Sequence, residues 1–115
     1  MNIKKLEKRI GVGIEDKEIF KEALTHRSFL NENPEHQYPS NERLEFLGDA
    51  ILDFVTAVWL YNRFPEYQEG PLTSLRAALV CTGTLARFAR QIGIDTHLLL
   101  GRGEQEGGGR TRDSV

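Results

Sequence analysis

The stretch from residue 40 to residue 64 constrains the fold more than any other, because its apolar residues recur at helical intervals. Spacings mostly of three and four, typical of an amphipathic helix, separate Leu44, Leu47, Ile51, Phe54, Val55 and Val58. We expect one long helix, capped by Ser40 and ending near Phe64, since Pro65 disfavours helical geometry in the residue before it. The alternating period of a strand occurs nowhere in the sequence, so we predict an all-α domain.

The polar side of this helix is acidic. On a helical wheel of about 100° per residue, four carboxylates fall within about 80° of one another: Glu42, Glu45, Asp49 and Asp53. Like charges one turn apart destabilise a helix by about 0.2–0.5 kcal/mol per pair. We therefore interpret these carboxylates as a functional site and not as a helix face that is acidic only for solubility. Gly48 costs roughly 1 kcal/mol against alanine inside a helix, which suggests a close approach to the backbone there. Phe46 lies on the acidic side, where we expect it to meet a partner.

Four shorter helices are predicted from the same period. They cover residues 3–10, ending near Gly11 or Gly13; a segment through Leu24 with Asp16 as its cap; a segment opened by Glu69-Gly70-Pro71; and a segment over residues 85–92 with Gly93 as its C-terminal cap. Between them, residues 25–39 lose the period and carry Asn and Pro, so we expect a loop. The glycine-rich residues 101–112 lack a phosphate-binding motif and are expected to be a mobile connector.

Composition narrows the class of protein. At 115 residues the chain is one domain at most, and a formal charge of −2 gives no electrostatic footprint for nucleic acid. A single cysteine, Cys81, excludes an intrachain disulfide and indicates a reducing compartment; its apolar helical surroundings predict burial. We find no signal peptide and no run of about 18 apolar residues. We therefore expect a cytoplasmic protein with no membrane association.

The long helix contains the stretch Asn41-Glu-Arg-Leu-Glu-Phe-Leu-Gly-Asp-Ala50. This stretch resembles, nearly letter for letter, the signature of the ribonuclease III endonuclease domain. Supporting stretches follow in the family's order: Ala23-Leu-Thr-His-Arg-Ser28 before the signature, Glu69 to Ala77 after it, and Gly101-Arg-Gly-Glu104 with Gly108-Gly-Arg110 near the end. The resemblance covers essentially the whole chain.

The resemblance implies a helical, homodimeric, Mg²⁺-dependent nuclease, with Mn²⁺ able to substitute, that cuts both strands of double-stranded RNA in rRNA and mRNA processing. No small-molecule cofactor is expected. By position, Glu45 and Asp49 would be catalytic, metal-binding carboxylates, Glu42 and Glu69 would be further acids of the catalytic valley, and Phe46 would be a dimer contact. Independently of the resemblance, His26 and Arg27 at the start of the expected loop are candidates to touch RNA phosphate or the signature helix, with a structural histidine bonded to backbone as the favoured interpretation for His26.

One departure from the family matters. After a segment like Arg110–Val115 the family continues into a helix with an Asp-x-x-Glu pair that completes the metal site, and this sequence stops at Val115. We therefore expect residues 1–115 to be a partial endonuclease domain without a double-stranded-RNA-binding domain. The alternative is a non-catalytic module for dimerisation or RNA scaffolding. A di-iron carboxylate bundle is disfavoured, because no Glu has a His three residues later.

Overall fold

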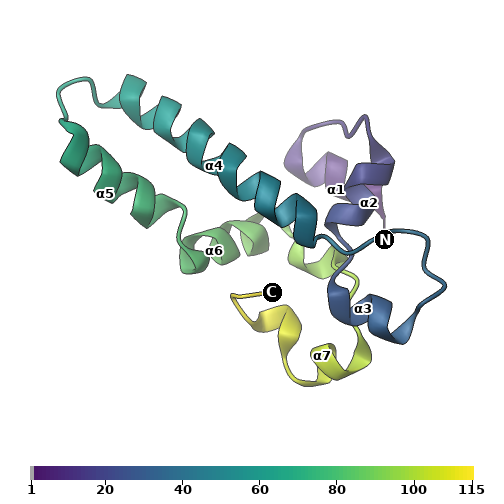
Figure 1. Ribbon diagram of the computed structural model, residues 1–115. Coiled ribbons are helices and arrows are strands. Elements are labelled where there is room, and N and C mark those ends of the chain that lie inside the picture. Colours follow the sequence, from purple (N-terminus) through teal and green to yellow (C-terminus); the bar gives the residue numbers. More distant parts are fainter. Residues whose placement is uncertain (1) are drawn as a thin grey trace.

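The computed structural model describes residues 2–115, which form helices joined by short connections (Figure 1). The helices are α1 (Ile3–Ile10), α2 (Lys17–Ala23), α3 (Arg27–Glu32), α4 (Glu42–Arg63), α5 (Glu69–Leu79), α6 (Thr82–Ile92) and α7 (Arg102–Glu106), with one-turn 3₁₀ helices η1 (Asp95–His97) and η2 (Gly109–Thr111). Within these residues an isolated bridge between Thr25 and Leu99 is the only extended pairing. The predicted all-α class is confirmed.

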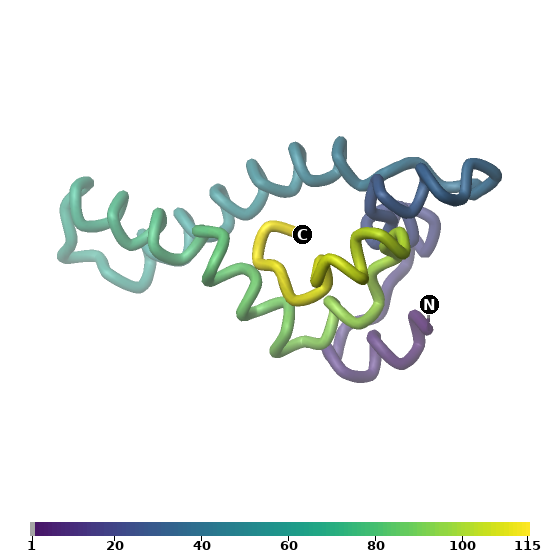
Figure 2. Tube along the Cα trace, turned by 90° about the horizontal axis from the view of Figure 1, so that it is seen from below, coloured from purple at the N-terminus to yellow at the C-terminus, as the bar shows by residue number. Residues whose placement is uncertain are grey.

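The long helix α4 and α5 form a hairpin that projects from the other helices (Figure 1). The radius of gyration is 16.2 Å and the extents are 52 × 30 × 23 Å, whereas a compact domain of this length has a radius of about 13 Å. The chain end turns back toward the start of α4 and toward α6, as Figure 2 shows from below. The hairpin therefore extends beyond the globular end instead of packing inside it.

The globular end is organised around Leu24 and Thr25, which are almost completely buried together with Leu6 and Leu100. Backbone hydrogen bonds tie this point to two distant segments. Leu99 N donates to Leu24 O at 2.8 Å, and Asn41 N donates to Thr25 O at 2.9 Å. The residues that follow α2 thereby fix both the segment that leads to α7 and the residue from which α4 begins.

Local capping signals in the sequence are confirmed where the partner lies within one helical turn. Asp16 Oδ1 accepts hydrogen bonds from Glu18 N (3.1 Å) and Ile19 N (3.0 Å) at the start of α2. Gly11 ends α1 and Gly93 ends α6, with φ angles of 71° and 76° in the left-handed region that glycine tolerates.

The predicted cap of the long helix is wrong. Asn41, without a side-chain cap hydrogen bond, occupies that position. Ser40 lies one residue earlier, and its hydroxyl donates to Glu42 Oε2 at 3.2 Å instead of accepting from the backbone.

Both stretches that were expected to be irregular contain helix, so these predictions are also wrong. α3 lies within the predicted loop, where His26 Nδ1 acts as the cap by accepting from Ser28 N at 3.2 Å. α7 and η2 lie within the predicted connector. Glu32 at the end of α3 accepts hydrogen bonds from Arg102 N (2.8 Å) and Gly103 N (3.2 Å), which satisfies two of the free amides at the start of α7.

Most of the apolar stripe of α4 is exposed within residues 2–115. Ile51 is 53% exposed and Phe54 is 69% exposed, and of the residues of α4 only Leu60 is buried. A Cβ at Gly48 would meet nothing within 4 Å, so no described part of this chain makes the expected close approach. No helix in residues 2–115 is both long enough and apolar enough to cross a membrane.

Cys81 is exposed, contrary to the predicted burial. It occupies the cap position of α6, with Sγ 3.3 Å from Ala78 O and 3.2 Å from Thr84 Oγ1. The hydrogen bond with the Thr84 hydroxyl, aided by the backbone amides at the start of α6, lowers the pKa of the Cys81 thiol. An apolar neighbourhood in sequence did not translate into burial, because this residue lies at a corner between α5 and α6.

Candidate functional site

A cavity of about 350 Å³ opens at the start of α4. Its walls come from three parts of the chain: α3 and its cap (His26, Arg27, Ser28, Asn31), the start of α4 (Asn41, Glu42, Glu45) and the chain end (Ser114, Val115). Hydrogen-bond donors thus line one wall and carboxylates line another. We call this the acidic cavity.

Two contacts orient the carboxylate of Glu42 at the edge of the acidic cavity. Arg27 Nη1 lies 3.4 Å from Glu42 Oε1, and Ser40 Oγ donates to Oε2 at 3.2 Å. The side chains of Arg27 and Glu42 are 69% and 55% exposed, so solvent screens this ion pair and it contributes little to stability. The expectation that Arg27 touches the signature helix is confirmed.

Glu45 and Asp49 lie one helical turn apart on α4, and both are exposed. Side chains at this spacing have Cβ atoms about 5–6 Å apart. Glu45 lines the acidic cavity with Glu42, whereas Asp49 lies one turn further along the same helix. The unbroken helix from Glu42 to Arg63 keeps all three acids at the spacings that the sequence predicts.

The donor set suits a hard divalent cation. Within residues 2–115, no group of three or more His, Cys, Asp or Glu side chains lies close enough together to hold a metal ion. Mg²⁺ binds through one or two carboxylates and keeps several waters, with substrate phosphate completing its coordination. Glu45 and Asp49 provide the two carboxylates that such a Mg²⁺ site needs, and Mg²⁺ prefers oxygen ligands.

Glu69 does not join these acids within one chain. Glu45 is eighteen residues from the end of α4, or about 27 Å at 1.5 Å per residue, and Glu69 begins α5 beyond that end. It lines a different cavity, of about 390 Å³, with Tyr61 and Arg76. Phe46, the predicted dimer contact, is 84% exposed. Both positions lie on the hairpin and not in the acidic cavity.

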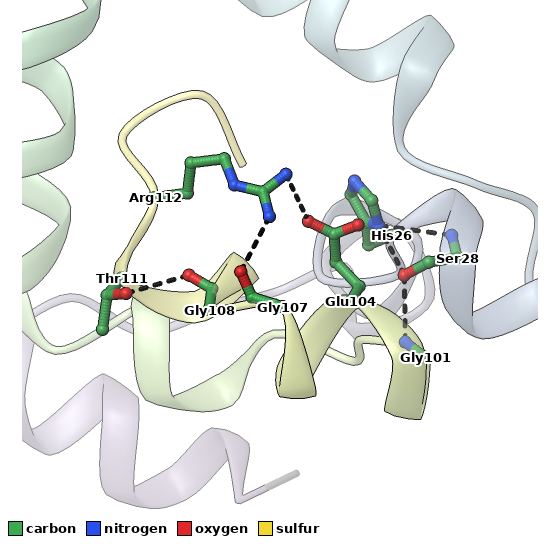
Figure 3. Close-up of polar contacts among 8 residues, drawn as sticks. All are labelled: His26, Ser28, Gly101, Glu104, Gly107, Gly108, Thr111 and Arg112. Atoms are coloured by element: carbon green, nitrogen blue, oxygen red, sulfur yellow. Dashed lines mark hydrogen bonds and ion pairs between the residues drawn. The ribbon is translucent and has the colours of Figure 1, made fainter.

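The donor wall is held by hydrogen bonds that connect α3 to α7 (Figure 3). Gly101 N donates to Ser28 Oγ at 2.9 Å, and Ser28 Oγ lies 2.7 Å from His26 Nδ1. Since Ser28 N also donates to Nδ1, the interpretation of His26 as a backbone-bonded histidine is confirmed. The sequence offered no usual signal for this cap, because histidine is not among the preferred N-cap residues.

A second set of contacts holds the chain end beside the acidic cavity. Arg112 Nη1 lies 3.1 Å from Glu104 Oε1, and Arg112 Nη2 donates to Gly107 O at 3.1 Å (Figure 3).

At the start of α7, the amides of Arg102 and Gly103 hold the pKa of Glu32 below its ordinary value. Sequence reasoning missed Glu32, whose partners lie about 70 residues away.

Comparisons with known proteins agree with this architecture. Residues 16–115 match the family described as Ribonuclease-III-like. Ribonuclease 3 of Enterococcus faecalis is 46% identical over 110 residues, which are 96% of this chain and 48% of that protein. Ribonuclease 3 of Oceanobacillus iheyensis is 43% identical over 115 residues, which are 100% of this chain and 50% of that protein.

A solved nuclease domain of ribonuclease III from Campylobacter jejuni superposes with a TM-score of 0.86 at 39% identity, covering 98% of this chain and 75% of that one. That structure is described as flexible in a region involved in its dimer formation. A second structure of the same domain gives a TM-score of 0.85.

An all-helical chain that is built around an acidic helix and aligns over nearly its whole length with these domains shares their structural class. The chain belongs to the Ribonuclease-III-like family, as the stretch Asn41–Ala50 predicts. It spans about half the length of the curated relatives that it matches.

Proposed function

We propose that this chain is part of an endoribonuclease that hydrolyses double-stranded RNA by Mg²⁺-dependent phosphodiester cleavage. The observation that carries the proposal is the acidic cavity, in which Glu42 and Glu45 lie together at the start of the helix that bears the family signature. In a cell, the proposed enzyme would act in the cytoplasm on ribosomal and messenger RNA precursors, as a homodimer.

The chemistry follows from the charge of the substrate. A phosphodiester is a poor electrophile, because its anionic oxygens repel a nucleophile and hydrolysis adds negative charge to the attacked and leaving oxygens. A bound Mg²⁺ supplies a water of lowered pKa and offsets the developing charge. In this proposal Glu45 and Asp49 hold the cation, and Mn²⁺ can replace it. Glu42, oriented by Arg27 and Ser40, contributes negative charge at the edge of the site.

The experiment compares cleavage of a duplex RNA by the wild-type chain with cleavage by Glu45→Gln and Asp49→Asn at fixed Mg²⁺. Each variant removes one charged ligand and keeps the size of the side chain, and misplacing a reacting group by about 1 Å costs on the order of 10²-fold in rate. We expect a loss of at least that size. Asp53→Asn is the matched control, because Asp53 lies one turn beyond Asp49 on the same face. Cleavage that neither substitution lowers would refute the assigned roles.

A second candidate function is a non-catalytic module for dimerisation or RNA scaffolding. It is supported by the exposed apolar side chains of α4, among them Phe46 at 84%, and by the lack of a three-ligand metal group in residues 2–115. This function predicts self-association without cleavage. A chain that sediments as a monomer over the micromolar range would count against it, and metal-dependent cleavage would favour the enzyme.

A further inference from the structure

His26 is a residue of the acidic cavity wall, and its imidazole has one ring nitrogen engaged and the other free. Nδ1 lies 3.2 Å from Ser28 N and 2.7 Å from Ser28 Oγ. Nε2 makes no hydrogen bond to any of residues 2–115, and in Figure 3 the dashed lines reach only one of the two ring nitrogens. A residue of the donor wall therefore carries an unused polar atom, Nε2.

The hydrogen bonds determine which nitrogen carries the proton. A backbone N–H only donates, so Ser28 N requires Nδ1 to be an acceptor. An unprotonated Nδ1 cannot donate, so the Ser28 hydroxyl donates to Nδ1 while it accepts from Gly101 N. A neutral imidazole with an unprotonated Nδ1 has its proton on Nε2. The backbone amide of Ser28 thus makes Nε2 the protonated nitrogen, and Nε2 is a donor.

A hydrogen-bond donor in the acidic cavity would offset the repulsion between its carboxylates and a phosphodiester. Glu42 and Glu45 repel a phosphodiester, and each pair of like charges 4 Å apart costs about 1 kcal/mol even in bulk water. Arg27 also lies on the donor wall, but its guanidinium is already 3.4 Å from Glu42. Nε2–H of His26 is a donor that a phosphate oxygen can use without breaking a contact between residues 2–115.

We propose that His26 is a substrate-contacting residue, whose Nε2–H donates to a non-bridging phosphate oxygen of duplex RNA in the acidic cavity, while Ser28 holds its tautomer. This inference rests on the proposed function, because it takes the duplex RNA of that proposal as the ligand. It assigns His26 a role that its cap at α3 does not require. Capping uses Nδ1, and substrate contact uses Nε2.

Two substitutions separate these roles. His26→Asn keeps an acceptor for Ser28 N, since asparagine is among the best N-cap residues, but it lacks the distant donor. His26→Gln places an amide N–H near the position of Nε2 and weakens the cap. We expect His26→Asn to melt like the wild-type chain and to bind a short fluorescent RNA duplex about 10- to 100-fold more weakly, the loss of one hydrogen bond to a charged group. His26→Gln should melt earlier and recover part of the affinity.

An NMR measurement tests the tautomer independently of RNA. Long-range ¹H–¹⁵N spectra of the wild-type chain should show His26 Nδ1 as an unprotonated nitrogen and Nε2 as protonated, and the duplex should shift the Nε2–H signal. A protonated Nδ1 in the free neutral ring overturns the inference. If the wild-type chain binds and cleaves duplex RNA and His26→Asn binds equally well, the inference alone fails. If the wild-type chain neither binds nor cleaves duplex RNA, the proposed function fails and this inference fails with it.

Discussion

Replacement of Gly101 by alanine is expected to disrupt the junction between α3 and α7. Gly101 is buried at the cap position of α7, where φ is −64° and ψ is 155°, a conformation open to any residue. A Cβ there would lie 2.5 Å from Ser28 O and 2.7 Å from Glu32 Oε1. The glutamate can rotate away, but the carbonyl belongs to the backbone of α3. One of the two helices must therefore move.

The expected change in the free energy of unfolding of Gly101→Ala is the difference between two effects. Forcing an extra methyl group into a packed site costs about 1–3 kcal/mol, and removing a glycine from the unfolded chain returns about 0.4–1 kcal/mol. We expect Gly101→Ala to lower the free energy of unfolding by roughly 1–2 kcal/mol. At about 4 °C per kcal/mol for a chain of this length, the thermal midpoint should fall by roughly 4–8 °C.

Gly103→Ala is the matched control for this experiment. It lies two residues further along, inside α7, where the nearest atom to a new Cβ is Glu32 Oε1 at 3.9 Å. Alanine is favoured over glycine in a helix by up to about 1 kcal/mol, so this variant should melt at or above the wild-type midpoint. Circular dichroism melts of the two variants provide the comparison. If Gly101→Ala melts with the wild-type chain, or Gly103→Ala is the more damaged of the two, the steric argument is wrong.

Three other outcomes depend on single contacts. Asp16→Ala should lower the free energy of unfolding by about 1 kcal/mol in urea titrations, because it removes the cap of α2, and Asp16→Asn should be nearly neutral. The amides of Arg102 and Gly103 keep the pKa of Glu32 below 4.5, so its carboxylate contributes stability that is lost as the pH falls from 4.5 downward. Between about pH 6 and about pH 3, the melting midpoint of Glu32→Gln should therefore fall by less than that of the wild-type chain. Equal falls would contradict this. Phe46→Ala should change stability by less than about 0.5 kcal/mol, since the side chain is 84% exposed, yet weaken self-association about tenfold in sedimentation equilibrium.

Local information in the sequence was sufficient for the helices whose signals lie within a few residues. The long acidic helix, the cap at Asp16 and the glycines that end α1 and α6 could all be predicted. The same holds for the relative placement of Glu42, Glu45 and Asp49, because a regular helix converts their spacing directly into geometry. The acids of the candidate site on α4 could therefore be identified from their order along the chain.

Tertiary contacts decided the rest. At the start of α7, Glu32 accepts from Arg102 N and Gly103 N, and Ser28 accepts from Gly101 N, across separations of 70, 71 and 73 residues. No local pattern records such pairings. Whether an apolar face is buried also depends on what packs against it, so the stripe of α4 predicted a core that residues 2–115 do not provide. The sequence alone determined which side chains share a helix face, because that depends only on helical period. The folded chain determined which faces meet, because that depends on segments far apart in the sequence.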